Sequence, residues 1–310
     1  MGREDIQQGS ILIVGVGALA TLFASRLGRA GYAVTMLGTW PDGLMALRNR
    51  GARLVEANGR EQRVSVVATD DPQVCRDARY ALVLVKSWQT ERAAAQLAGC
   101  LPRAGLALTL QNGLGNREIL AASLGRERVA LGSTTTGATL LGPGLARSGG
   151  DGLVSIEAHE RLGPLQQALT AAGFQVEVVQ DARALIWSKL VVNSAINPLT
   201  AILRIPNGQL LERPAARLLL RALAEETAAV ASAEQIKLGP SDPVRMVEDV
   251  ALRTAANHSS MFQDVQRGAP TEIDAICGAV AKAGRQHRIP TPMNQACWQL
   301  VQALTQAPVS

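Results

Sequence analysis

Three polar residues stand four positions apart in a largely apolar stretch, Ile186 to Thr200: Lys189, Asn193 and Asn197. Residues at i, i+4 and i+8 share one face of a helix. Asparagine is a poor helix-interior residue, so this row needs either a buried polar network that joins two helices or a polar ligand. A lysine in such a row suits general acid chemistry, in which the ammonium group gives a proton to a developing oxyanion. We predict that the row faces a ligand.

Lysine is rare in this chain, which makes its placement informative. Only four of the 31 basic residues are lysines, and a position that needs only positive charge would be expected to carry arginine in such a chain. Lysine can lose its proton when it is desolvated, and arginine cannot. Lys86 ends the apolar run Ala81 to Val85, where it either reaches a phosphate beyond a strand end or extends to the surface.

The segment ILIVGVGALATLFASRLGRAGYAV, residues 11–34, predicts a strand, a glycine turn, a helix and the start of a second strand. The turn is Gly15-Val16-Gly17-Ala18-Leu19-Ala20. A G-x-G-x-x-G/A loop between a strand and a helix lets backbone N–H groups approach a pyrophosphate. Glycines at strand ends also form ordinary turns, but the strand context favours dinucleotide binding.

Two further polar clusters are candidates for ligand contacts. The sequence QNGLG follows a predicted strand over 106–110, so Asn112 either contacts a coenzyme or substrate or simply forms a turn. The hydroxyls and amides of residues 257–263, Ser259 and Ser260 among them, could bind a small polar acid. Thr271 and Asp274 predict a capping-box start for a helix over 272–287, and we expect Glu272 to lie near Lys189 and to influence its protonation.

The elements that must position these residues fall into two classes. Strand-like runs over 64–69, 80–86, 106–110 and 129–132, with helices between several of them, predict a mainly parallel, doubly wound sheet. Runs at 153–158 and 175–179, which flank a helix over 162–172, could extend this sheet, and 132–152 predicts loops or irregular strands. From about residue 184 the patterns are helical, at 184–203, 209–235, 243–268 and 272–287. Pro198 should kink or end the first of these helices and leave the Ser194 carbonyl without its partner.

The predicted fold is therefore α/β, with a Rossmann-type N-terminal domain over 1–183 and an all-α domain over 184–310. The chain has 310 residues, of which 47% are hydrophobic and 18% charged, as in a globular protein. We expect a cytoplasmic location, because there is no membrane-span or signal-peptide pattern and residues 1–9 read as a disordered leader. The scattered cysteines and histidines predict buried thiols and no metal site. The net charge of +5 with only 3% aromatic residues argues against nucleic-acid binding.

Taken together, these motifs resemble the ketopantoate reductase family (2-dehydropantoate 2-reductases). The resemblance runs from GVGALA through LVKSWQT, QNGLGN, TTTGA and WSKLVVNSAINPLTAI to NHSSMFQDVQRGAPTEIDAICG. It implies that NADPH reduces 2-dehydropantoate to (R)-pantoate for pantothenate and coenzyme A synthesis. It also implies that Lys189 is the proton donor and that Glu272 supports both the catalytic and the coenzyme site. The implied substrate ligands are Asn112, Asn193, Asn197, Asn207 and Ser260, with Ser259 beside them. The implied coenzyme contacts are Gly15 to Ala20, Lys86, Asn112 and Ala138.

One position departs from the family pattern. Family members commonly carry an arginine after the second strand to hold the 2′-phosphate of NADP, and here the sequence reads Leu37-Gly38-Thr39-Trp40-Pro41. Thr39 and Lys86 could serve that phosphate, so we favour NADP(H), with NAD(H) as the alternative. A related reductase of another oxo acid, or a dinucleotide-sensing protein, also remains open. We expect a monomer or a homodimer.

Overall fold

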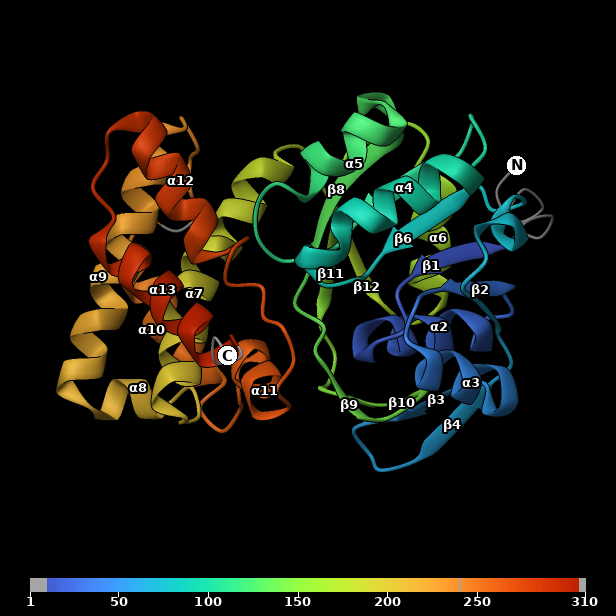
Figure 1. Cartoon of the computed structure of the whole chain (residues 1–310), viewed down its shortest axis with the longest axis horizontal. Helices are drawn as coiled ribbons and strands as arrows, with labels where there is room; N and C mark the ends of the chain where they lie inside the picture. Colours follow the sequence, from blue (N-terminus) through green and yellow to red (C-terminus); the bar gives the residue numbers. More distant parts are fainter. Residues whose placement is uncertain (1–9, 240, 307–310) are drawn as a thin grey trace. The chain divides into compact units, whose positions relative to one another are not determined.

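The computed structural model describes residues 10–239 and 241–306, and the predicted leader over 1–9 lies outside the described residues. The chain forms two compact units (Figure 1). The first, a sheet-containing unit, comprises Met1–Val85, Gln89–Gln111 and Asn116–Ala182, of which Ser10 onward is described. The second, a helical unit, comprises Lys86–Trp88, Asn112–Gly115 and Arg183–Ser310. The helical unit thus takes two short pieces from the N-terminal half of the chain.

The first unit is built on an eight-stranded sheet. Its strands are β1 (Ile11–Val14), β2 (Val34–Leu37), β5 (Val67–Thr69), β6 (Tyr80–Val83), β7 (Leu106–Thr109), β8 (Val129–Thr134), β11 (Leu153–Glu157) and β12 (Gln175–Val179), in the order β12-β11-β8-β7-β6-β1-β2-β5. All pairs are parallel except β8 with β11. This confirms the predicted doubly wound sheet and its extension by the last two strands.

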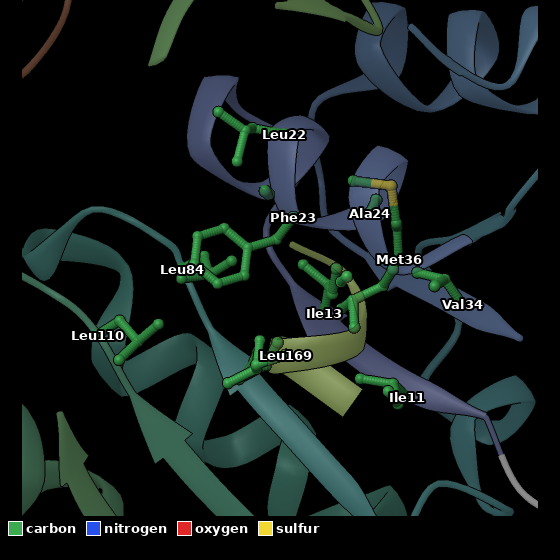
Figure 2. Close-up of a cluster of buried hydrophobic side chains, with 14 of the residues drawn as sticks. Ile11, Ile13, Leu22, Phe23, Ala24, Val34, Met36, Leu84, Leu110 and Leu169 are labelled. Carbon is green, nitrogen blue, oxygen red and sulfur yellow. The ribbon is translucent and has the colours of Figure 1, made fainter. Parts of the chain in front are cut away.

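Alternation along β1 explains how helices cover both faces of this sheet. Ile11 and Ile13 point to a core with Phe23, and Leu12 and Val14 point to a separate core with Leu97. Figure 2 shows the first core, in which the side chains of Phe23, Ile13 and Leu84 belong to one buried cluster. Strands buried on both faces are typical of parallel sheets. The helices of this unit are α2 (Ala18–Arg29), α3 (Pro41–Arg50), α4 (Thr90–Cys100), α5 (Asn116–Leu124) and α6 (Gly163–Ala171), with 3₁₀ turns η1 (Pro72–Cys75) and η3 (Arg126–Arg128).

A second, four-stranded sheet was not predicted. It has the order β4-β3-β10-β9, from β3 (Ala52–Val55), β4 (Glu61–Val64), β9 (Ala138–Gly142) and β10 (Leu145–Ser148). The predicted single strand over 64–69 is therefore wrong, since β4 pairs with β3 in this sheet and β5 pairs with β2 in the large one. The glycine- and threonine-rich stretch 132–152 supplies the end of β8 together with β9 and β10.

The C-terminal part of the chain is helical, as predicted. Its helices are α7 (Ala182–Leu203), α8 (Gln209–Glu212), α9 (Pro214–Ala233), α10 (Pro243–Arg253), α11 (Ser260–Gln266), α12 (Cys277–His287) and α13 (Pro292–Thr305). The expected helix over 209–235 is interrupted at Arg213, because the residue before a proline avoids the helical conformation. The expected helix over 243–268 is interrupted by residues 254–259, and α13 was not foreseen. No described helix is both long and apolar enough to cross a membrane.

Two local predictions in the helical unit need correction. Pro198 does not end α7, which continues to Leu203, so of the two predicted alternatives the kink stays a prediction. The helix predicted to start at Glu272 starts at Cys277, and residues 272–276 form turns. Asp274 does not cap the Thr271 end, because its carboxylate accepts hydrogen bonds from Trp298 Nε1 (2.7 Å) and Gln302 Nε2 (2.8 Å). Tertiary partners on α13 thus displace the local capping pattern.

Candidate active site

The polar row predicted from sequence lies along one side of α7. Lys189 and Asn193 are half-buried, and Asn197 is buried. Within the part of the chain that the structure describes, neither asparagine side chain forms a hydrogen bond to protein. Because a buried amide without a partner is costly, these two side chains depend on water or a ligand.

In the helical unit, Glu272 contacts three other residues of the candidate site. Its buried carboxylate accepts a hydrogen bond from the Ser87 backbone N–H at Oε1 (3.1 Å) and from Asn112 Nδ2 at Oε2 (3.0 Å). Lys86 Nζ is 3.8 Å from Oε2. Ser87 begins the short 3₁₀ turn η2 (Ser87–Gln89). One carboxylate therefore holds both short pieces that this unit takes from the N-terminal half.

A second buried carboxylate, which sequence reasoning did not assign, binds Lys86 directly. Asp264 Oδ2 accepts from Lys86 Nζ at 2.6 Å, and Oδ1 accepts from Arg267 Nη2 at 2.7 Å. The Asp264 side chain is only 3% exposed, so two cations neutralise a carboxylate that burial would otherwise destabilise. The sequence signal that could have marked Asp264 is an acidic residue close to the apolar pair Met261 and Phe262, and all three residues are buried in α11.

The two lysines of this site differ in their protonation. Burial alone would lower the pKa of Lys86, but the carboxylates of Glu272 and Asp264 outweigh it and raise that pKa above its usual value. Burial lowers the pKa of Lys189 to about 8, and the Glu272 carboxylate offsets part of the fall. Lys86 therefore stays a cation, while Lys189 can release a proton close to neutral pH.

The glycine turn of the sheet unit has the geometry of a phosphate cradle. Gly15 has φ of +132°, and a Cβ there would lie 3.2 Å from the Leu84 carbonyl group, so this position requires glycine. A Cβ at Gly17 would meet no described atom within 4 Å. Gly17 precedes α2, whose first turn carries no acidic residue, and Ala20 is fully buried where the helix packs on the sheet. The open space at Gly17 and the uncompensated helix N-terminus fit an anionic dinucleotide.

Beyond the end of β2, Thr39 lines a cavity of about 300 Å³. Arg48 and Asp70 line the same cavity. The Arg48 guanidinium donates from Nε to the Ala68 carbonyl (2.7 Å) and from Nη2 to Asp70 Oδ1 (2.8 Å). Arg48 lies farther beyond the second strand than the arginine of the family pattern, but it lines the same cavity as Thr39. Ala138, the other predicted coenzyme contact of this unit, is half-buried at the start of β9.

Comparison with known proteins places these motifs in one family. Residues 11–161 match the family described as "Ketopantoate reductase PanE/ApbA", and residues 181–305 match "Ketopantoate reductase PanE/ApbA C terminal". The chain belongs to the ketopantoate reductase family. It is 36% identical to the 2-dehydropantoate 2-reductase of Archaeoglobus fulgidus, over 95% of this chain and 97% of that protein.

Solved structures of similar proteins agree with this family membership. The PanE/ApbA family ketopantoate reductase from Ralstonia eutropha is 32% identical, with a TM-score of 0.89 over 96% of this chain and 98% of that one. D-mandelate dehydrogenase, solved with NADH and anilino(oxo)acetate, has the same TM-score at 24% identity over 96% and 98% of the two chains, which indicates a shared fold.

The remaining residues expected from the ketopantoate reductase pattern have varied surroundings. Ser259 caps α11, because its Oγ accepts from the Phe262 N–H (3.1 Å) and from the Thr200 hydroxyl (2.7 Å). Ser260 is exposed at the start of α11. Asn207 is buried and donates from Nδ2 to Thr254 Oγ1 (2.9 Å), while its Oδ1 has no hydrogen-bond partner among the described residues.

The structure brings the predicted site residues together in two groups. In the helical unit, Glu272 accepts a hydrogen bond from Asn112 and forms an ion pair with Lys86, and its carboxylate also acts electrostatically on Lys189. The glycine turn, Thr39 and Ala138 belong to the sheet unit. In the described residues no group of three His, Cys, Asp or Glu side chains could hold a metal ion.

Proposed function

We propose that this protein reduces the ketone of 2-dehydropantoate to (R)-pantoate, with a nicotinamide dinucleotide as coenzyme, as a step of pantothenate and coenzyme A synthesis. Family membership supports the reaction, and 36% identity to a full-length relative of that name supports the substrate. The observation that carries the mechanism is a half-buried lysine whose pKa is lowered to about 8, in line with two amides that lack protein partners.

The sheet unit is proposed to supply most of the coenzyme contacts, and residues 184–310 most of the substrate contacts. Gly15 to Ala20 would bind the pyrophosphate, and Thr39, Lys86, Asn112, Ala138 and Glu272 would complete the coenzyme site. When bound, the reduced nicotinamide supplies the hydride. We favour NADP(H), because the cavity beside Thr39 also contains the guanidinium of Arg48. NAD(H) stays the alternative, because the carboxylate of Asp70 lines the same cavity and acidic residues bind the ribose of NAD in such folds.

Lys189 is the proposed general acid. A ketone oxygen that gains negative charge needs a positioned cation and a proton, and the Lys189 ammonium group supplies both. Glu272 raises the pKa of Lys189 against the effect of burial and so keeps it protonated at neutral pH. Asn193 and Asn197, together with Asn112, Asn207, Ser259 and Ser260, would hydrogen-bond the carboxylate and hydroxyl groups of the substrate. Cytoplasmic location and a monomeric or homodimeric state stay predictions.

The test is oxidation of NADPH, and in parallel of NADH, by the purified protein on addition of 2-dehydropantoate. Lys189→Ala is expected to abolish turnover. Lys282→Ala is the matched control, since Lys282 lies on the same unit with its Nζ 5.6 Å from the Trp298 ring centroid and should leave the rate unchanged. Binding of the coenzyme without turnover would assign the protein to another oxo acid or to a sensing role, and a panel of 2-oxo acids separates these outcomes.

A further inference from the structure

The helix that carries Lys189 has a gap in its backbone hydrogen bonds. Pro198 lies inside α7 and has no N–H, so the Ser194 carbonyl cannot receive the usual bond from four residues ahead. Ser194 and the residues up to Thr200 are all buried, which limits access of water to this carbonyl. A buried carbonyl with an unmet hydrogen bond destabilises its surroundings.

A thiol from another helix fills this gap. Cys277 Sγ donates to the Ser194 carbonyl oxygen at 3.7 Å, a length suited to sulfur. Cys277 is the first residue of α12 and is fully buried. Burial raises the pKa of the Cys277 thiol well above its usual value, so the donor proton is retained at working pH.

The position of this contact links two parts of the proposed active site. Ser194 directly follows Asn193 in α7, and Cys277 follows the turn segment that begins at Glu272. On its side-chain oxygen, Ser194 also forms a 2.8 Å hydrogen bond with Thr227 of α9. Residues of two other helices therefore contact Ser194. Cys277 of α12 binds its backbone carbonyl, and Thr227 of α9 binds its side chain.

We propose that Cys277 is a positioning residue of the active site: its thiol satisfies the carbonyl freed by Pro198 and so holds Asn193 and Asn197 in register with Glu272. The proposal rests on the function proposed above. It explains why a cysteine stands at the start of α12, at a position where the protein uses its hydrogen-bond donor and none of its nucleophilicity.

The experiment compares three variants. Cys277→Ala removes the donor, Cys277→Ser keeps a donor of similar size, and Cys297→Ala removes a second buried thiol, on α13 of the same unit, for which no hydrogen bond to α7 is found among the described residues. Cys277→Ala is expected to lower kcat and raise the KM for 2-dehydropantoate, with kcat/KM down about fivefold, the equivalent of about 1 kcal/mol. Cys277→Ser should restore kcat/KM to within about twofold of the wild type, and Cys297→Ala should leave it unchanged.

Backbone hydrogen exchange of α7 tests the contact without any catalysis. Amides on the two sides of Pro198 are expected to exchange faster in Cys277→Ala than in Cys277→Ser or Cys297→Ala. Equal kcat/KM in Cys277→Ala and the wild type, equal losses in both alanine variants, or a loss that serine does not rescue would each overturn the positioning role. Absence of turnover in the wild type would refute the proposed function instead, and the exchange comparison would still decide whether the thiol holds α7.

Discussion

Lys189 should lower the stability of the fold that carries it, and Lys189→Met is expected to make the protein more stable while it abolishes turnover. A pKa lowered from the usual 10.5 to about 8 means that the folded protein disfavours the charged lysine by about 3 kcal/mol, at 1.36 kcal/mol for each pH unit. Methionine has a similar length and no charge. Since it cannot replace the polar interactions of the ammonium group, the expected gain is about 1–3 kcal/mol at neutral pH.

The sign of the pH dependence follows from linkage. Below about pH 8 the lysine is protonated in both the folded and the unfolded states, so the full cost of burying the charge is present. Between pH 8 and 10.5 the folded protein has released the proton and the unfolded chain has not, so the cost fades as pH rises. The stability difference between Lys189→Met and the wild type should therefore be largest near pH 7 and small near pH 10.5.

Denaturant unfolding followed by tryptophan fluorescence measures this difference. Three of the four tryptophans, Trp88, Trp187 and Trp298, belong to the helical unit, so the signal reports mainly on the part that holds Lys189. Lys282→Met changes an exposed lysine of the same unit and should produce no gain. A Lys189→Met protein that is no more stable than the wild type at pH 7, or equally stabilised at both pH values, would refute the reasoning.

Three further changes test the other parts of the site. Glu272→Gln removes the charge that raises the pKa of Lys189, so the pH above which reduction slows should fall below about 8 in a pH series of initial rates; an unmoved profile would contradict this. The Cβ added by Gly17→Ala would meet no described protein atom within 4 Å, so the denaturant midpoint of unfolding should stay unchanged. Coenzyme affinity, measured by NAD(P)H fluorescence, should weaken about tenfold or more. Unchanged affinity would argue against the pyrophosphate site. Thr39→Arg should raise the kcat/KM ratio of NADPH to NADH about tenfold, since a charge-assisted hydrogen bond contributes about 1.5–3 kcal/mol; a constant ratio would place the 2′-phosphate elsewhere.

The features that sequence predicted well are those set by neighbouring residues. β1, the glycine turn and α2 follow one another within a short segment, and each has its own periodic pattern. The row of Lys189, Asn193 and Asn197 was predictable for the same reason, because helical spacing alone places the three on one face. Pro198 shows the limit of such reasoning. Its missing hydrogen bond was foreseen, but the thiol that donates to the Ser194 carbonyl belongs to a residue 83 positions away in the chain.

The features that sequence missed depend on partners far apart in the chain. Asp264 pairs with Lys86 across 178 residues, and no local pattern marks that pair. The small sheet pairs Arg53 of β3 with Leu145 of β10, 92 positions later in the chain, and strands of four residues leave little periodic signal. At Thr271 the capping pattern was present, yet the side chain it needed at Asp274 is held by α13.

The interleaved course of the chain limits how this protein can be cut and recombined. A fragment that begins at residue 184 would carry Glu272 and Asp264 but would lose Lys86, Ser87 and Asn112, which supply their hydrogen-bond donors. Two buried carboxylates would then have lost charged or polar partners, which is strongly destabilising. Chimeras that exchange the sheet unit between relatives should therefore keep residues 86–88 and 112–115 from the same parent as the helices, because these residues contact the helical unit although they precede it in the sequence.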